Sequence, residues 1–366
     1  MNLGGSDAPQ KTKGFAGTRM NTLGTRLAKV LDVDADHIMA HTKGLWEEFR
    51  GKRLFITGGT GFFGCWLLES FVRANEEFGL NAEVVVLTRA PEAFMGRVPR
   101  LARHPAIVYH KGDVRDFAFP DGRFSHVIHA ATETSAILNA ENPLLVLDTM
   151  IEGTRRVLDF TIHSGAKKFL LTSSGAVYGR QPPALTHIPE TYQGAPDPLD
   201  SGAAYGEGKR VAELLCAIYA KQYGVEAKIA RCFAFVGAGL PLDAHFAIGN
   251  FIRDAKNGGP VKVKGDGTPV RSYLYAADLA IWLWTILVRG RSCTPYNVGA
   301  SDGYSISALA GIVAKLLGDV GHVIDCPALE GVLPDRYVPD VARAAVELGL
   351  RPVISLEEAV LRTGRG

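Results

Sequence analysis

The sequence predicts an α/β fold in which a doubly wound parallel sheet is joined to a smaller, discontinuous C-terminal domain. From Arg53 onward, short apolar runs alternate with stretches of helical periodicity, as is typical of parallel strands joined by crossover helices. Most of these runs are continuously apolar, which indicates strands buried on both faces of a sheet. After Gly237 the pattern changes to short strand and helix candidates separated by Pro and Gly, and this change predicts the second domain.

The elements of the larger domain follow from apolar runs and helical spacing. Residues 1–50 precede the first clear strand and form an N-terminal extension, in which an amphipathic helix is expected near Ala28–Phe49. Strands are predicted at Leu54–Thr57, Val84–Leu87, Ile107–Tyr109, His126–His129, Phe169–Thr172 and Ala227–Ala230. Helices are predicted at Cys65–Phe78, Leu144–His163 and Ala203–Tyr223.

The remaining elements set the expected domain boundaries. Residues 51–236 form the larger domain, with a return segment near 276–300, and residues 237–366 form mainly the smaller one. Within this last part, short strands are predicted at Val261–Lys264 and Ser272–Tyr275, and helices near Ala276 and Ile306.

Composition excludes several classes of protein. A hydrophobic content of 47% and a charged content of 21% are typical of a globular chain, and a formal charge of +2 without a dense basic block argues against a nucleic-acid partner. No apolar run approaches the roughly 20 residues that cross a bilayer, so no membrane partner is expected. Met1–Met20 lacks the apolar core of a secretory signal, which predicts a cytoplasmic location. The five cysteines contain no C-x-x-C pair, which favours reduced thiols over disulfides or a metal site.

A glycine-rich turn directly follows the first predicted strand. Residues 58–64 read Gly-Gly-Thr-Gly-Phe-Phe-Gly and lead into a predicted helix. Glycine lets the backbone approach a pyrophosphate, whose charge is met by amides at the helix N-terminus. This strand–turn–helix context predicts a Rossmann-type dinucleotide site. The residues of the turn expected to contact the dinucleotide are Gly58, Thr60, Gly61, Phe62, Phe63 and Gly64.

The residues after the second and third strands leave the choice between NAD and NADP open. Many NAD enzymes place an acidic residue at the end of the second strand, but Thr88 and Arg89 stand there in this chain. Arg89 either pairs with a 2′-phosphate, stacks on adenine or lies in solvent. Asp113 either accepts a hydrogen bond from the adenine amine or caps its own loop, and Val114 beside it is expected to line the cofactor site.

Three residues form a candidate catalytic trio. Ser174 ends the fifth predicted strand, and Tyr205 and Lys209 lie four residues apart at the start of a helix, which places both on one helix face. An unperturbed phenol, with a pKa near 10, is a poor base at neutral pH, so we expect the Lys209 ammonium and an oxidised nicotinamide to lower the pKa of Tyr205. Tyr205 is then the general base or acid, and Ser174 hydrogen-bonds the substrate oxygen that exchanges the proton.

Four segments together resemble the extended short-chain dehydrogenase/reductase family, in its nucleotide-sugar epimerase/dehydratase group. They are Gly58–Gly64, His129–Thr132, Leu171–Gly179 and Tyr205–Lys209, within a likeness that spans roughly residues 52–360 by motif placement. Further segments resemble UDP-glucuronate decarboxylases and their sugar-epimerase relatives most. These are Tyr205–Glu213, Arg271–Tyr273 and Pro339–Asp340.

The resemblance implies a nucleotide diphosphate sugar as substrate, transient oxidation at the sugar 4-position and a homodimer formed through two long helices per subunit. It favours NAD over NADP. The cofactor site that it implies also contains Ala130, Ala131, Thr132, Tyr205 and Lys209. Substrate contacts are expected from Thr132 and Ser174, with Asn250, Arg271 and Arg336 at the diphosphate, although surface arginines are commonly only solvated.

Departures from the family pattern bear on the reaction. Dehydratases of the group resemble one another in an Asp-Glu pair after the catalytic Ser or Thr, and decarboxylases have a Glu there, but Gly175 and Ala176 occupy these positions. Neither residue ionises, so dehydration is disfavoured and decarboxylation weakened. Ala234 and Met150 replace an Asn that is usual in each of two other family segments, so some substrate and backbone contacts must differ.

An epimerase, which needs only the trio, is therefore the leading hypothesis. A nucleotide-4-ketosugar reductase, or a decarboxylase, remains the alternative, since a reductase would use the same trio. A dinucleotide sensor without turnover is disfavoured, because it has no need for Ser174, Tyr205 and Lys209 together.

Overall fold

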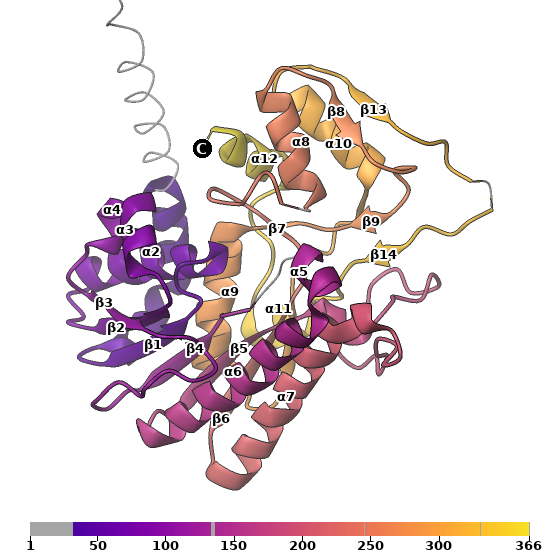
Figure 1. Ribbon diagram of the computed structural model, residues 1–366. Coiled ribbons are helices and arrows are strands. Elements are labelled where there is room, and N and C mark those ends of the chain that lie inside the picture. The colour runs from indigo at the N-terminus through magenta and orange to yellow at the C-terminus, as the bar shows by residue number, and fades with distance from the viewer. Residues whose placement is uncertain (1–31, 133–135, 245, 330, 366) are drawn as a thin grey trace, which may run out of the picture.

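A seven-stranded parallel sheet organises the chain (Figure 1). The computed structural model describes residues 32–132, 136–244, 246–329 and 331–365. In sequence order the strands are β1 (Arg53–Thr57), β2 (Glu83–Thr88), β3 (Ile107–Lys111), β4 (His126–His129), β5 (Lys168–Ser174), β6 (Glu226–Cys232) and β11 (Pro295–Val298). Across the sheet they follow the order β11-β6-β5-β4-β1-β2-β3, and every pairing is parallel. The predicted α/β fold is confirmed, and each predicted strand of the larger domain is present.

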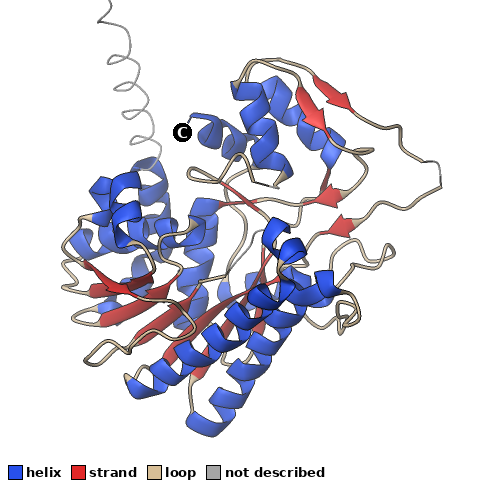
Figure 2. Cartoon of the chain, viewed as in Figure 1, coloured by secondary structure: helices blue, strands red, loops and turns tan. Residues whose placement is uncertain are grey.

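Helices cover both faces of this sheet (Figure 2). One face carries α2 (Phe62–Glu77) and α9 (Ala276–Arg289), and the other carries α6 (Pro143–His163) and α7 (Ala204–Tyr223). Alternate strand residues serve the two layers: Ile56 and Leu170 pack toward the first pair of helices, and Phe55 and Phe169 toward the second. The short helices α3 (Pro91–Arg97), α4 (Pro99–Ala102) and α5 (Ala136–Glu141) lie in the connections.

Both long helices begin and end within one residue of the predicted limits. Asn142 caps α6 by accepting a hydrogen bond from the Leu145 amide, and Pro143 occupies its first position, where proline needs no helical N–H partner. Gly224, in the left-handed conformation, ends α7. Local start and stop signals therefore fix the limits of these two helices.

A second unit stands above the carboxyl edge of the sheet in Figure 1. It contains α8 (Ala247–Lys256), α10 (Ile306–Leu316) and α12 (Leu356–Arg365), with β8 (Val261–Val263) paired to β13 (His322–Ile324). β9 (Val270–Arg271), β12 (Tyr304–Ser305) and β14 (Arg336–Tyr337) form a small sheet beside the larger domain. β10 (Leu274–Tyr275) pairs with β7 (Phe235–Val236), and α11 (Ala342–Leu348) precedes the final helix. The strand predicted at Ser272–Tyr275 is thus wrong in its limits, because the chain changes sheets between β9 and β10.

Residues 32–49 pack against the main core. Residues 32–42 are α-helical and lead into the 3-10 helix η1 (Lys43–Phe49); residues 28–31 of the predicted amphipathic helix lie outside the described part. Trp46 and Phe49 contact Trp284 of α9, with ring centroids 5.0 Å and 5.3 Å apart. This segment completes the layer over α9, which explains why α9 is apolar on nearly all sides.

A buried carboxylate ties this segment to the C-terminal helix. Asp34 has no solvent exposure, accepts a hydrogen bond from the Tyr275 hydroxyl at 2.6 Å and pairs with the Arg362 guanidinium of α12. Nearby, His37 Nε2 lies 2.8 Å from the buried Asp278. These contacts join three regions that are distant in sequence.

Three further features of the described residues concern membrane-spanning helices, metal ligands and cysteines. None of their helices combines the length and hydropathy that crossing a membrane requires. Their His, Cys, Asp and Glu side chains nowhere gather in a group of three or more suited to a metal ion. The five cysteines, all within the described ranges, are free thiols.

Replacing Asp34 by Ala should lower the free energy of unfolding by about 3 kcal/mol, because it leaves the Arg362 charge, only 15% exposed, without its buried partner. Urea denaturation followed by circular dichroism measures this effect. Asp36→Ala is the matched control on the same helix, since its carboxylate is 67% exposed and should contribute less than about 1 kcal/mol. Equal effects of the two substitutions would contradict the packing of residues 32–49 into the cooperative core.

Candidate active site

The turn between β1 and α2 is built so that only glycine fits at its ends. Gly58 has a φ of +72°, and a Cβ atom there would lie 2.4 Å from the carbonyl carbon of Ala130 after β4. A Cβ atom on Gly64 would lie 2.3 Å from the Cα of Gly59. The close packing brings the N-terminus of α2 against the carboxyl ends of β1 and β4.

The first turn of α2 offers donors to an anion. The helix is capped by Gly61, and the amides of its first residues have no carbonyl partner within the helix. Thr60, Phe62 and Phe63 complete this turn, with Phe63 packed edge-on against Phe235 at 5.0 Å. Backbone N–H groups at a helix N-terminus suit a pyrophosphate, so the donors present fit the predicted dinucleotide.

Arg97 of α3 approaches the same turn, and sequence reasoning missed it. Its guanidinium donates a hydrogen bond to the Thr60 carbonyl oxygen. No spacing signal in the sequence identifies Arg97, because the contact depends on how α3 lies over the turn.

The ends of β2 and β3 place Arg89 and Asp113 near each other. Thr88 and Lys111 are paired across these strands, so the residues that follow meet at one edge. Asp113 accepts hydrogen bonds from the Arg115 backbone amide at 3.0 Å and from Arg115 Nε at 2.9 Å, which is the loop-capping geometry. Arg115, and more weakly Arg89, hold the pKa of Asp113 below its usual value. Arg89 itself is exposed.

Val114, beside Asp113, is partly buried. A Cβ atom on Gly153 of α6 would come within 3.0 Å of its side chain. Val114 therefore packs between the end of β3 and α6.

Two hydrogen bonds hold the Lys209 ammonium next to the segment that follows β4. Its ammonium donates hydrogen bonds to Thr132 Oγ1 at 2.6 Å and to the Thr172 carbonyl oxygen at 2.7 Å, and the residue is only 3% exposed. Burial lowers the pKa of Lys209 to about 8. The preceding Ala130 and Ala131 donate their amides to the backbone oxygen and hydroxyl of Thr57 at 3.1 Å each, which fixes the strand end on which Thr132 stands.

Tyr205 lies one helical turn before Lys209 and faces Ser174. Burial raises the pKa of Tyr205 to about 12, and a hydrogen bond with Ser174 opposes this effect. The expectation that the Lys209 ammonium lowers the phenol pKa is therefore wrong for the structure as it stands. The physical reason is that Lys209 is directed at Thr132 and Thr172, so desolvation of Tyr205 dominates.

A second tyrosine, which sequence reasoning also missed, joins Ser174. The Tyr337 hydroxyl lies 3.5 Å from Ser174 Oγ, and burial raises the pKa of Tyr337. A Cβ atom on Gly175 would lie 2.7 Å from that hydroxyl. Tyr337 follows Arg336, which the sequence did single out, but no motif spacing connects residue 337 with residue 174.

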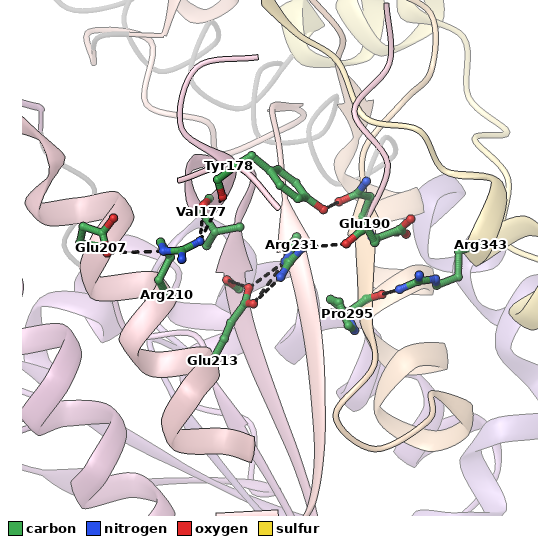
Figure 3. Close-up of polar contacts among 12 residues, drawn as sticks. Val177, Tyr178, Glu190, Glu207, Arg210, Glu213, Arg231, Pro295 and Arg343 are labelled. Atoms are coloured by element: carbon green, nitrogen blue, oxygen red, sulfur yellow. Dashed lines mark hydrogen bonds and ion pairs between the residues drawn. The ribbon is translucent and has the colours of Figure 1, made fainter. Parts of the chain in front are cut away.

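A partly buried ion pair supports the strand that carries Ser174 (Figure 3). Glu213 of α7 binds the Arg231 guanidinium at 2.6 Å and accepts a hydrogen bond from the Ser173 hydroxyl at 2.5 Å. Arg231 also stacks over the Tyr178 ring at 4.7 Å, and the Tyr178 hydroxyl donates to Asn297 Oδ1 at 2.7 Å. This network holds β5, α7, β11 and the segment after Ser174 in one arrangement.

The residues expected at a diphosphate lie on different elements. Arg271 on β9 and Arg336 on β14 belong to adjacent strands, whereas Asn250 is on α8, where its Oδ1 accepts a hydrogen bond from Arg253 at 3.1 Å. Arg271 pairs with Asp335 at 2.7 Å, and its charge also lowers the pKa of Tyr337 slightly against burial. The structure therefore places Arg271 opposite Tyr337 and Arg336 directly before it in one small sheet, and Asn250 on a separate helix.

Comparison with known proteins shows the family of the chain. Residues 54–299 match the profile of the NAD dependent epimerase/dehydratase family. UDP-glucuronic acid decarboxylase 1 of Danio rerio is 31% identical over 85% of this chain and 72% of its own length.

Two solved structures share the fold. The UDP-glucose 4-epimerase of Thermotoga maritima superposes with a TM-score of 0.71 at 23% identity, covering 85% of this chain and 97% of its own. The dTDP-glucose 4,6-dehydratase DesIV of Streptomyces venezuelae superposes with a TM-score of 0.70 at 24% identity, covering 86% and 96%.

The profile match extends over most of the chain and includes the glycine turn, Ser174, Tyr205 and Lys209. The predicted preference for NAD agrees with the cofactor that the family's description names. The chain belongs to the NAD dependent epimerase/dehydratase family.

Proposed function

We propose that the protein is an NAD-dependent nucleotide-sugar epimerase that acts through transient oxidation at the sugar 4-position. The observation that carries this proposal is that Ser174, Tyr205 and Lys209 lie together in the fold. Beside them, position 175 is a glycine, which has no ionisable group and whose surroundings leave no room for one. Epimerisation at one carbon needs a single proton-transfer group, and Tyr205 is that group.

The roles of the residues follow from their positions. Tyr205 takes the proton of the sugar 4-hydroxyl as the hydride leaves carbon 4, and it returns the proton when hydride comes back to the opposite face. When bound, NAD supplies the acceptor and later the donor of that hydride. Ser174 hydrogen-bonds the 4-oxygen, and the Lys209 ammonium, which uses two of its three N–H donors on protein oxygens, has the third for the bound cofactor.

The positive charge of an oxidised cofactor, when bound, would act with the Ser174 hydrogen bond against the burial that raises the pKa of Tyr205. A phenol with a pKa of about 12 is almost wholly protonated at neutral pH. Its activation therefore belongs to the complex with cofactor and substrate.

A UDP-glucuronate decarboxylase is the second candidate, favoured by the 31% identity to UDP-glucuronic acid decarboxylase 1 of Danio rerio. Against it stand Gly175 and Ala176, the two positions after Ser174 where the resemblance implies an Asp-Glu pair in dehydratases and a Glu in decarboxylases, because neither residue ionises. Tyr337 and Phe233 also occupy the space beside Gly175, at 2.7 Å and 2.8 Å from where a Cβ atom on that residue would lie. A 4-ketosugar reductase would use the same trio but would consume reduced cofactor.

The expected homodimer is supported by an exposed apolar face on α6 and α7. Leu144 and Ile162 of α6 are 70% and 38% exposed, and Leu214 and Ile218 of α7 are 59% and 37% exposed. The two helices lie side by side along the outside of the sheet (Figure 1). Large apolar side chains gathered on one helical face are typical of a protein interface.

The epimerase proposal is tested by incubating the purified protein with UDP-, GDP-, CDP- and dTDP-linked hexoses and hexuronates and recording proton NMR spectra. We expect inversion at carbon 4 of at least one sugar, without net formation of reduced cofactor and without carbon dioxide. Release of carbon dioxide from a hexuronate would establish the decarboxylase instead, and stoichiometric consumption of reduced cofactor by a ketosugar would establish the reductase.

Tyr205→Phe is the variant that separates an enzyme from a sensor in these assays. It should lower turnover at least about 1,000-fold, because it removes the proton acceptor, while NADH binding measured by fluorescence stays within about threefold. Turnover that survives this substitution would contradict the assigned role.

Introducing charge on α7 tests the dimer. The double substitution Leu214→Glu and Ile218→Glu should convert a dimer to a monomer in size-exclusion chromatography with light scattering, since it buries two carboxylates at the contact. Val346→Glu on α11 is the control, because Val346 is 84% exposed on another surface and should leave the mass unchanged. A dimer that resists the double substitution would place the interface elsewhere.

A further inference from the structure

We propose that Tyr337 is a positioning residue that orients the Ser174 hydroxyl toward the sugar 4-oxygen and Tyr205. This inference rests on the proposed function, because it assigns Tyr337 a part in the same proton transfer. It concerns a residue on β14, about 160 positions after Ser174 in the sequence and in contact with it in the fold.

The hydrogen-bonding capacity of Ser174 carries the argument. A serine hydroxyl accepts two hydrogen bonds and donates one. Ser174 Oγ accepts one from the Ala176 amide at 3.1 Å, and the Tyr337 hydroxyl lies 3.5 Å away on the same atom. When Tyr337 donates, both acceptor positions are filled, and the only freedom left to Ser174 is to donate its proton toward Tyr205 and the substrate.

The distance of 3.5 Å is long for a bond between two hydroxyl groups, whose usual separation is about 2.8 Å. Catalytic hydrogen bonds commonly tighten when substrate occupies the site. Tyr337 is held where such tightening needs little movement, since its ring packs on Phe233 with centroids 4.6 Å apart and its backbone is paired with β9.

The glycine at position 175 makes this arrangement possible. Its missing side chain leaves the space in which the Tyr337 hydroxyl and the edge of the Phe233 ring lie, 2.7 Å and 2.8 Å from where a Cβ atom would be. A residue of any other type at 175 would displace the hydroxyl from Ser174. Gly175 thus has two consequences: it removes an ionisable group from the site, and it admits a phenol from the C-terminal part of the chain.

Tyr337 also connects the proton-transfer group to the substrate side. A hydrogen bond with Ser174 lowers the pKa of both Tyr205 and Tyr337 against the effect of burial. Arg271, next to Tyr337 across the β9–β14 pair, is a candidate for the substrate diphosphate. A substrate that binds Arg271 therefore contacts the same small sheet that carries Tyr337.

Tyr337→Phe tests the role in turnover, with Tyr219→Phe as the matched control. Tyr219 lies on α7, the helix that also carries Tyr205, but its hydroxyl donates a hydrogen bond to Asp159 at 2.6 Å and not to Ser174. The Tyr219→Phe variant loses that hydroxyl. We expect Tyr337→Phe to lower kcat about tenfold with a KM change under about threefold, and to move the acidic limb of the pH–rate profile to higher pH, because Tyr205 loses part of the stabilisation of its phenolate. Tyr219→Phe should leave kcat, KM and the pH profile unchanged.

A double-mutant cycle shows whether Tyr337 acts through Ser174. In a Ser174→Ala background, Tyr337→Phe should change kcat less than about twofold, since the group that it orients is gone. Gly175→Ala should reproduce the kcat loss of Tyr337→Phe by pushing the hydroxyl aside. Multiplicative losses in the double variant, or a fully active Gly175→Ala enzyme, would overturn the proposal.

A measurement without turnover separates this proposal from the proposed function. In protein labelled with carbon-13 at the tyrosine ζ position, the Tyr205 and Tyr337 signals are assigned by their absence in Tyr205→Phe and Tyr337→Phe. The Tyr205 signal should move in Tyr337→Phe but not in Tyr219→Phe, and the Tyr337 signal should move in Ser174→Ala. Signals that stay in place would refute the positioning role, whether or not any nucleotide sugar is turned over.

Discussion

A buried ammonium is the interaction on which the candidate site depends. Lys209 is 3% exposed and is held by Thr132 Oγ1 at 2.6 Å and the Thr172 carbonyl oxygen at 2.7 Å. A charge in this position is costly unless polar atoms surround it, so the two oxygens and the helix that carries Lys209 must keep their relative places. Because β5, α7 and the segment after β4 each contribute one partner, the same contact fixes Tyr205 one turn earlier on α7 and Ser174 two residues beyond Thr172.

The chemistry available at the site is set as much by what is absent as by what is present. Relatives of this chain are named for decarboxylation, epimerisation and dehydration on a shared fold, so the fold alone does not select a reaction. Gly175 and Ala176 supply no second acid or base, and Tyr337 and Phe233 occupy the space beside Gly175. Around Ser174 the chain offers the hydroxyl groups of Ser174, Tyr205 and Tyr337, and under the proposed function this set is suited to moving one proton at one oxygen.

Local signals made the sheet, its long helices and the glycine turn predictable. Continuous apolar runs placed β1 to β6 of the seven-stranded sheet but not β11, and a cap, a proline and a terminal glycine limited α6 and α7. The contacts that sequence could not supply are those between distant elements: Arg97 over Thr60, Tyr337 against Ser174, and Asp34 with Arg362. They depend on how whole elements dock, which no spacing along the chain records.

The prediction that Lys209 lowers the pKa of Tyr205 was wrong for a related reason. The spacing predicted that Lys209 lies near Tyr205, but it does not record where the hydrogen bonds of Lys209 point. The central claim, that this ammonium organises the cofactor end of the site, is tested most directly by NADH affinity as a function of pH. Because burial lowers the pKa of Lys209 to about 8, the wild type should lose affinity as pH rises through about 8 and the amine becomes neutral. Lys209→Met should bind NADH at least about tenfold more weakly at neutral pH and show no such change. Superimposable affinity profiles of the two proteins would contradict the account.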